Sequence, residues 1–187
     1  WFQECKNSSG SSIGVPFRDT SIERKFSFPI SVTERCKPMF ERYLTFDATL
    51  KAAVHNFNAG HPVSDWYSIQ EGSRATTVPK TSSIDRMICI EPTGNMYLQQ
   101  GLMSLMYDRM SHFGLDVSSL PDLHNQLAYE SSITSRYATI DWSSASDCVS
   151  IELLRWLLPP KWFFILDLVR SPNITMDGDV IELNMFS

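Results

Sequence analysis

The sequence predicts an α+β fold in which helices pack on a small antiparallel sheet. Two long stretches repeat apolar residues at helical spacing, residues 72–92 are strand-prone, and residues 174–185 have the pattern of a β-hairpin. Helices with scattered strands come first, followed by strand, helix, helix and hairpin. This order is typical of α+β proteins.

Length and composition suit one medium-sized globular domain or a piece of a larger protein. The chain has 187 residues, of which 43% are hydrophobic and 20% charged. Its net charge of −5 argues against a uniformly basic surface but is compatible with a local basic channel. Its 4 cysteines include no C-x-x-C pair, which disfavours a zinc site and favours a reducing compartment. We find no signal peptide and no bilayer-spanning run, and both ends suggest a fragment.

Residues 7–32 are expected to form a polar loop and then a strand. The Ser- and Gly-rich residues 7–14 have amides that can hold an anion, but no phosphate-loop lysine follows, so a surface loop is preferred. Phe26, Phe28 and Ile30 alternate as in a half-buried strand.

Two long helices are expected in the middle of the chain. The first spans residues 34–57, with Thr33 as its N-cap. The second follows Asn95 as its N-cap and has Gly114 as its C′ residue. Its apolar stripe, interpreted as core, consists of Met96, Leu98, Leu102, Leu105, Met106, Met110 and Phe113.

The last part of the chain is predicted to contain three helices and a hairpin. A short helix is expected over about 121–130, and an apolar, and therefore buried, helix over 149–158. Two prolines separate the latter from a helix over 160–169. The turn Asp177-Gly178 then joins two strands within residues 174–185.

Three basic residues occur in the strand-prone segment 72–92. Arg74, Lys80 and Arg86 lie among β-branched residues, with a turn expected at 81–83. Lys80 and Arg86 are an even number of residues apart, so extended geometry places them on one face. Two cations on one face suit a triphosphate, which needs several donors and the planar fork of arginine.

The acidic stretch Ala138–Ser150 is the strongest functional signal. Strand-forming residues lead to Asp141, and a serine-rich turn leads to Asp147 at the start of an apolar helix. Aspartate is a poor strand former, so Asp141 at a strand end needs a reason. The commonest reason is a hard cation such as Mg²⁺, which takes one or two carboxylates and shares its other positions with water and phosphate.

Structural interpretations of two of these residues are also open. Arg86 can form a surface salt bridge with Asp85 or Glu91. Ser144 and Asp147 have the S-x-x-D spacing of a capping box, in which each side chain bonds the backbone of the other. Spacing alone does not decide between these interpretations and ligand binding.

Several separated blocks, in the same order, resemble the replicase subunit of the leviviruses, which are small positive-strand RNA phages. The blocks are T-V-P-K-T-S-S-I-D-R-M-I-C-I-E-P-T-G-N-M-Y-L-Q from Thr77, A-T-I-D-W-S-S-A-S-D from Ala138, and L-P-P from Leu158. The resemblance is specific over about 72–187 and loose over 1–71. Members of this family are RNA-dependent RNA polymerases.

The resemblance implies a right-hand polymerase fold, with residues 1–136 in the fingers and residues 137–187 beginning the palm. Trp142 stands where the family has a smaller apolar residue and must find room in the palm core. The implied site residues are Asp141 as a ligand of the catalytic Mg²⁺ pair, Ser143, Ser144 and Asp147 beside the ribose of the incoming nucleotide, and Arg74, Lys80 and Arg86 on its triphosphate.

The resemblance also implies partners and a mechanism. Template and product RNA, nucleoside triphosphates and host translation factors are the expected partners, in the cytoplasm of a bacterial host and without a membrane. In nucleotidyl transfer one metal activates the primer hydroxyl and another stabilises the leaving pyrophosphate. The family's later Met-Gly-Asn-Gly turn and G-D-D hairpin do not occur in this chain. We therefore expect no polymerase activity from this chain alone.

Other functional classes are compatible with parts of the pattern. A reverse-transcriptase-like palm shares a strand-end aspartate, but it would place a bulky gate against the ribose in place of the small serines. A non-catalytic RNA-binding or assembly module would keep the basic residues and have no use for Asp141. An aspartic protease is disfavoured because no D-[ST]-G turn follows the carboxylate.

Overall fold

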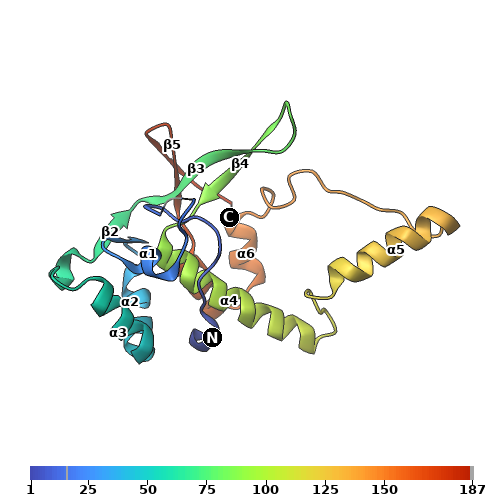
Figure 1. Ribbon diagram of the computed structural model, residues 1–187. Helices are drawn as coiled ribbons and strands as arrows, with labels where there is room; N and C mark the ends of the chain where they lie inside the picture. The colour runs from blue at the N-terminus through green and yellow to red at the C-terminus, as the bar shows by residue number, and fades with distance from the viewer. Residues whose placement is uncertain (16, 186–187) are drawn as a thin grey trace.

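The computed structural model describes residues 1–15 and 17–185 and shows a mixed α/β protein (Figure 1). The α-helices are α1 (Ile22–Phe26), α2 (Lys37–Phe46), α3 (Ala48–Phe57), α4 (Thr93–His112), α5 (Leu120–Thr134), α6 (Ile151–Leu157) and α7 (Pro160–Val169). The strands are β1 (Ile30–Thr33), β2 (Tyr67–Gln70), β3 (Gly72–Pro79), β4 (Asp85–Ile90), β5 (Asn173–Met176) and β6 (Asp179–Glu182). Short 3₁₀ helices span Phe2–Glu4 and Val63–Asp65. The predicted combination of helices with small sheets is confirmed.

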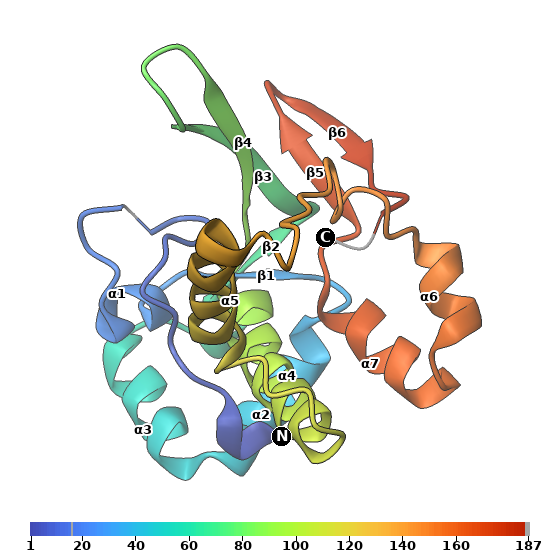
Figure 2. The same ribbon diagram turned by 90° about the vertical axis from the view of Figure 1, so that its right-hand side faces the viewer.

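The strands form two small sheets, and neither is purely antiparallel as predicted. β1 and β2 pair in parallel. The larger sheet has the order β4-β3-β5-β6, in which β3 is parallel to β5 and the other pairs are antiparallel. The prediction is wrong for the parallel pairs because each joins strands separated by helices rather than by a tight turn. Figure 2 shows the β3–β4 and β5–β6 hairpins projecting from the same side of the helices.

The hydrophobic core surrounds the first half of α4. Its completely buried side chains are Phe26, Ile30, Val32, Cys36, Phe40, Val54 and Leu98. The rings of Phe26 and Phe40 stack with their centroids 6.0 Å apart, and Tyr97 meets Phe26 edge-on at 5.1 Å. Val169 at the end of α7 belongs to the same core, so the N-terminal helices and α7 pack on one hydrophobic core.

The expected strand around Phe26 is the end of helix α1. Ser21 caps this helix by accepting a hydrogen bond from the Arg24 amide at 3.3 Å. Phe26 is buried while Phe28 is exposed, and strand β1 starts only at Ile30. The apolar alternation that suggested a longer strand therefore spans a helix end and a turn.

The helix expected over 34–57 consists of two helices. Asp47 lies between them in an extended conformation and caps α3 by accepting a hydrogen bond from the Leu50 amide at 2.9 Å. Thr33 ends β1, so its predicted role as an N-cap is wrong. A polar side chain able to cap locally interrupts the apolar stripe.

Helix α4 begins before its predicted N-cap. Pro92 is the N-cap, and Asn95 lies buried in the first turn. The Asn95 side chain accepts from the Thr33 amide at 2.9 Å and donates to the Thr33 hydroxyl at 2.9 Å and to the Val169 carbonyl at 3.0 Å. The N-cap prediction is wrong because Asn95 links β1 to α7 instead. Gly114, with φ +80°, follows the helix as predicted.

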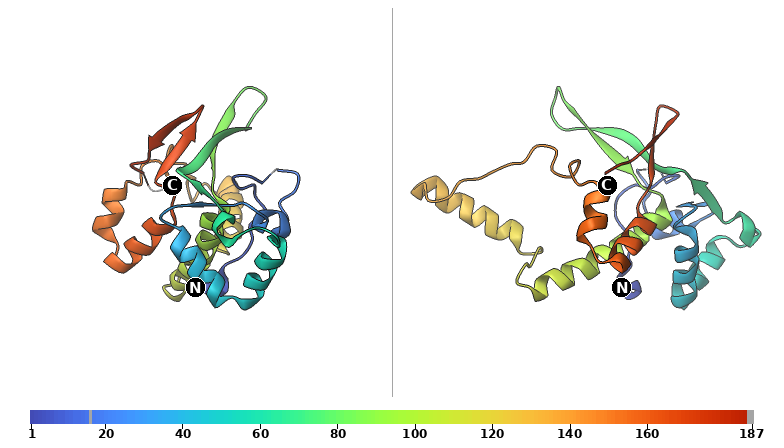
Figure 3. Two further views of the ribbon diagram at one scale, coloured as in Figure 1. Left: turned by 90° about the vertical axis from the view of Figure 1, so that its left-hand side faces the viewer. Right: turned by 180° about the vertical axis from the view of Figure 1, so that it is seen from behind.

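Only the first half of the predicted apolar stripe of α4 is core. Leu98 and Leu102 are buried, whereas Phe113 is 85% exposed. Figure 3 shows the second half of α4 extending away from the body of the protein toward α5. The expectation of a fully buried stripe is therefore wrong at its C-terminal end, where the described chain supplies no covering layer.

Helix α5 and residues 135–150 form an arm that leaves the body and returns to α6 (Figure 1). Helix α6 was expected to be buried because its sequence is apolar nearly all round. That expectation is wrong, since Trp156 is 82% exposed and α6 packs mainly against α7. Helix α7 has the predicted bounds, starting at Pro160.

The C-terminal hairpin is confirmed. β5 and β6 pair with Met176 opposite Asp179, and both turn residues have positive φ, +52° at Asp177 and +95° at Gly178. A turn of this kind suits Asp-Gly because these residues tolerate the left-handed conformation. Among the described residues, no helix is both long enough and apolar enough to cross a bilayer.

Candidate functional site

The predicted basic residues lie on the ribbon formed by β3, β4 and the turn between them, here called the basic hairpin. Arg74 pairs with Ile90, and Val78 pairs with Arg86. The Lys80 amide donates to the Ile84 carbonyl at 2.9 Å, which closes the ribbon. The turn predicted at 81–83 is confirmed.

Backbone geometry brings the three cations to one face of the basic hairpin. Successive side chains of a strand alternate, and directly paired residues share a face. Arg74 and Val78 therefore have the same orientation, and Arg86 joins them because it is opposite Val78. Lys80 follows the end of β3, and its hydrogen bond with Ile84 continues the same pairing, so alternation assigns it to this face as well. The sequence predicted a shared face only for Lys80 and Arg86. The register of the hairpin places Arg74 on that face as well.

These three side chains are exposed and carry no ion pair with any residue that the structure describes. The alternative in which Arg86 pairs with Asp85 or Glu91 is not observed. The Glu91 carboxylate accepts hydrogen bonds from Ser171 at 2.8 Å and Gln99 at 3.1 Å instead. Three uncompensated cations on one face can attract a polyanion such as a triphosphate.

The root of the basic hairpin is packed too closely for any residue but glycine at position 72. Gly72 pairs with Asn173 in the parallel β3–β5 contact. A Cβ atom at Gly72 would come within 1.9 Å of the Asn173 carbonyl oxygen, well inside van der Waals contact. This close approach joins the basic hairpin to the strand that follows α7.

The acidic half of the predicted site has a different structure from the one expected. Residues 138–141 form no strand, and Asp141 is exposed without an ion pair to any described residue. Its neighbours Ile140 and Trp142 are 79% and 76% exposed, so Trp142 does not occupy a core. The strand prediction is wrong for this chain because the segment has no described strand to share its backbone hydrogen bonds.

Ser143, Ser144 and Asp147 lie in an exposed turn that precedes α6. Ser144 has a φ of +53°, and the N-cap of α6 is Ser150, which accepts from the Leu153 amide at 3.1 Å. The predicted capping box is therefore wrong, because the helix starts later.

Asp147 lies near the root of the basic hairpin. Partial desolvation raises the pKa of the Cys89 thiol on β4, although the residue as a whole is exposed. A hydrogen bond with Ser73 opposes the shift, and the carboxylates of Glu91 and Asp147 add to it. By alternation, however, Cys89 faces away from Arg86. Among the described residues, Asp147 forms no ion pair with Arg74, Lys80 or Arg86.

The residues of this chain do not by themselves form a magnesium site. Within residues 1–15 and 17–185 no group of three His, Cys, Asp or Glu side chains is placed to hold a metal ion. Asp141 provides the hard oxygen that Mg²⁺ prefers, but one exposed carboxylate supplies a single ligand.

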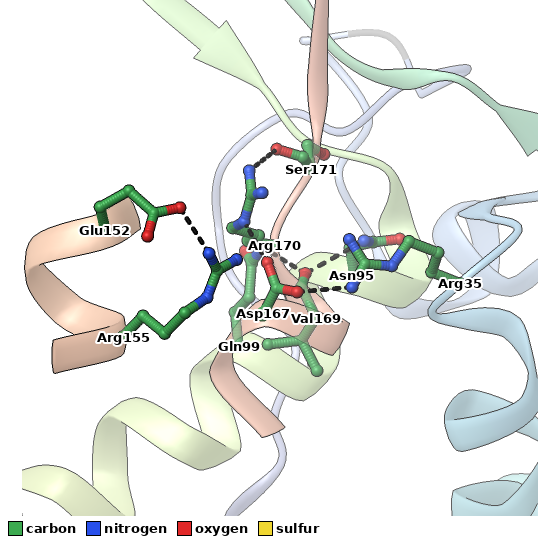
Figure 4. A network of polar contacts seen from close by, with 9 residues as sticks. All are labelled: Arg35, Asn95, Gln99, Glu152, Arg155, Asp167, Val169, Arg170 and Ser171. Atoms are coloured by element: carbon green, nitrogen blue, oxygen red, sulfur yellow. Dashed lines mark hydrogen bonds and ion pairs between the residues drawn. The ribbon is translucent and has the colours of Figure 1, made fainter. Parts of the chain in front are cut away.

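Sequence reasoning missed the structural importance of Glu91. Its half-buried side chain accepts hydrogen bonds from Gln99 on α4 and from Ser171 after α7. Gln99 also belongs to the network drawn in Figure 4, in which it and Asn95 both donate to the Val169 carbonyl. A carboxylate at the end of an apolar strand was the signal used for Asp141. Glu91 also follows an apolar, strand-prone run, but from the sequence it was considered only as a salt-bridge partner of Arg86.

Comparison with known proteins gives one consistent result. The protein family described as RNA replicase, beta-chain, matches residues 1–187, and so includes the first 71 residues. The chain is 37% identical over 189 residues to the RNA-directed RNA polymerase subunit beta of Escherichia virus Qbeta, covering 99% of this chain and 29% of that protein.

Two further relatives agree. The RNA-directed RNA polymerase beta chain of Escherichia phage MS2 is 32% identical over 188 residues, and that of Enterobacteria phage fr is 33% identical over 199 residues. Each alignment covers 100% of this chain and 33% of the relative. The chain therefore spans about a third of the length of the curated relatives it matches.

Proposed function

This chain belongs to the RNA replicase beta-chain family, and we propose that it is the part of an RNA-directed RNA polymerase that holds the incoming nucleotide's triphosphate. The observation that carries the proposal is the single exposed face shared by Arg74, Lys80 and Arg86, with no ion pair among the described residues. Arginine forks and a lysine ammonium suit phosphate oxygens, and their charge stabilises the negative charge that develops during transfer.

In this proposal the protein has a right-hand polymerase fold, in which residues 1–136 contribute to the fingers and residues 137–187 begin the palm. Residues 186–187 lie outside the described residues. Family membership over the whole chain supports this arrangement. We also propose the partners implied by the family: template and product RNA, nucleoside triphosphates and host translation factors, in a bacterial host.

Asp141 is proposed to supply one ligand to catalytic Mg²⁺, with the remaining carboxylates coming from residues outside this chain. When bound, the metal would supply activation of the primer hydroxyl and neutralisation of phosphate charge. The exposed carboxylate of Asp141 is available for such a role. Ser143, Ser144 and Asp147 are proposed to lie beside the ribose, where small polar groups accept the 2′-hydroxyl that marks an RNA precursor.

The proposal is tested in the full-length replicase by replacing Asp141 with asparagine. Asp141→Asn removes the charge and keeps the shape, so we expect primer extension on an RNA template to fall by about a thousandfold or more while RNA affinity is unchanged. Asp122→Asn, on the exposed arm helix α5, is the matched control and should leave both properties unchanged.

Two results would redirect the proposal. Equal loss of RNA binding and synthesis in Asp141→Asn would favour the non-catalytic RNA-binding module. Preferential incorporation of deoxyribonucleotides by the wild-type enzyme would favour a reverse-transcriptase-like polymerase. Preference for ribonucleotides, together with selective loss of synthesis, supports the proposal.

A further inference from the structure

Glu91 lies at the point where the basic hairpin joins the rest of the protein. It directly follows β4 and precedes the start of α4. One carboxylate oxygen accepts hydrogen bonds from Gln99 on α4 at 3.1 Å and from Ser171, just before β5, at 2.8 Å. The backbone carbonyl of Glu91 accepts from the Ile13 amide at 2.9 Å. One residue thus connects four segments of the chain.

A half-buried carboxylate is a costly choice for a purely structural link. Burial raises the pKa of Glu91, against the opposing hydrogen bonds from Ser171 and Gln99. No ion pair of Glu91 occurs among the described residues, so its partial desolvation is offset by these hydrogen bonds and not by a neighbouring cation. An acceptor that receives two hydrogen bonds fixes direction more strongly than apolar packing, because both bonds lose strength when they bend.

The rest of the basic hairpin has little support beyond this root. From Thr77 to Cys89 every residue is exposed, so no packed layer holds the outer ribbon. Its direction is therefore set by the β3–β5 pairing at Gly72–Arg74 and by the anchor at Glu91.

Small changes at this root are magnified at Lys80 and Arg86, the two cations that lie beyond it. Lys80 lies six positions after Arg74, which at about 3.3 Å per residue is a lever of about 20 Å. A tilt of about 5° at the root would then move the tip by about 2 Å along this lever. A misplacement of about 1 Å in a catalytic arrangement can cost about a hundredfold in rate.

We propose that Glu91, through its bonds to Gln99 and Ser171, is a positioning residue that sets the direction of the basic hairpin and hence the alignment of its cations on the triphosphate. The functional half of this inference rests on the proposed function. Glu91 does not touch the nucleotide, and it acts through Arg74, Lys80 and Arg86.

The test uses the full-length replicase with Glu91→Ala and Glu91→Gln. Because a single oxygen of Glu91 accepts both hydrogen bonds, the glutamine carbonyl can replace it, whereas alanine removes the anchor. The matched control is Glu182→Ala, which changes an exposed glutamate on β6 of the same sheet. We expect Glu91→Ala to raise the KM for nucleoside triphosphates about tenfold with a smaller change in kcat, and Glu91→Gln and the control to stay near wild type.

A distance measurement tests the hairpin direction without reference to activity. Spin labels at Lys51→Cys on α3 and Ser82→Cys at the hairpin tip report this direction when exposed Cys89 and Cys148 are replaced by serine. We expect Glu91→Ala to broaden or shift the distance distribution, with Glu91→Gln close to wild type. Unchanged distances and an unchanged KM in Glu91→Ala would overturn the inference.

Variants that each remove one hydrogen-bond donor test the same inference if Glu91→Ala does not fold. Ser171→Ala and Gln99→Ala each remove one of the two donors, and each should change KM and the distance distribution in the same direction by less. Their combination leaving both unchanged would overturn the inference. If the wild-type enzyme extends no primer, the proposed function fails, while the distance measurement still decides whether Glu91 sets the hairpin direction.

Discussion

The basic hairpin and the acidic segment 138–150 come from similar sequence signals and have different structures. Both contain β-branched residues that predict strands. In the basic hairpin each strand has its partner nearby, and β3 and β4 pair from Arg74–Ile90 to Pro79–Asp85. Residues 138–141 have no partner strand within the described chain and are exposed. Strand-forming composition therefore produced a strand only where backbone partners were present.

This contrast separates a self-sufficient half of the candidate site from a dependent half. The basic hairpin is anchored by Gly72 and Glu91, whose contacts all lie inside this chain. Asp141 and its exposed neighbour Trp142 have no such contacts. We expect residues 138–141 to become a strand when residues of the full-length protein outside this chain pair with them.

Polymerase activity should be undetectable in the 187-residue chain alone. The described residues hold no group of three potential metal ligands, so one carboxylate cannot support two-metal transfer. Primer extension on an RNA template, with the full-length replicase as the positive control, measures this. Template-dependent extension by the isolated chain would show that this chain alone supplies all the metal ligands that synthesis needs.

Arg86→Ala in the full-length enzyme should lower kcat/KM by about a hundredfold through a higher KM for nucleoside triphosphates. Arg86→Lys should recover only part of the loss, since lysine lacks the planar fork of arginine. Steady-state kinetics with varied nucleotide measures both variants. Arg136→Ala on the exposed arm is the matched control. An equal rise in KM in this variant would mean that the cations of the basic hairpin have no specific role in nucleotide binding.

Two tryptophans distinguish the packed and exposed regions by their contribution to stability. Trp66 is 6% exposed and donates to the His61 carbonyl at 3.1 Å, so Trp66→Ala should lower the free energy of unfolding by about 4 kcal/mol. Trp156 is 82% exposed on α6, so Trp156→Ala should change it by less than about 0.5 kcal/mol. Urea unfolding of the chain measures both. Similar losses of unfolding free energy in both variants would mean that Trp156 on α6 is buried in solution.

Two carboxyl groups near the end of α7 should give opposite pH dependence. The pKa of Glu91 is raised in the folded chain by burial, so the unfolded chain loses this proton first as pH rises, and stability falls over that interval. Burial acts to raise the pKa of Asp167, but hydrogen bonds from Arg35 and Arg170 outweigh it and lower the pKa. Asp167 therefore contributes stability above its ordinary pKa that is lost as pH falls toward its folded pKa.

Unfolding measured as a function of pH separates these contributions. Glu91→Gln should remove the loss of folding stability that occurs as pH rises. Asp167→Asn should remove the gain in folding stability that occurs as pH rises. The same pH dependence in both variants would contradict the assigned environments. These changes should be the smallest of the series because each concerns a single ionisation.

Local signals predicted those elements whose partners are close in the sequence. The Asp177-Gly178 hairpin, the turn at 81–83 and the Pro160 helix start each depend on a few adjacent residues, and all occur in the structure. The parallel pairing of β3 with β5 was not predictable in this way, because it joins residues 72–74 to 173–175.

Side chains with distant partners explain the remaining differences. Asn95 looks like an N-cap in sequence, but Thr33 and Val169 approach it only in the folded chain. In the candidate site, alternation correctly placed Lys80 and Arg86 on one face, whereas the anchor formed by Glu91 and Ser171 depends on residues far apart in sequence. The roles predicted for Asp141, Ser143, Ser144 and Asp147 remain predictions.

The central claim is that Asp141 and the basic hairpin act on the same nucleotide once the full-length protein is assembled. A double-mutant cycle between Asp141→Asn and Arg86→Ala tests it, with the measured quantity being the affinity of the full-length primed complex for a non-hydrolysable nucleoside triphosphate with Mg²⁺. We predict a coupling free energy larger than about 0.5 kcal/mol, because both residues would contact one metal-bound triphosphate. Strictly additive losses of affinity would place the two residues in separate sites and contradict the account.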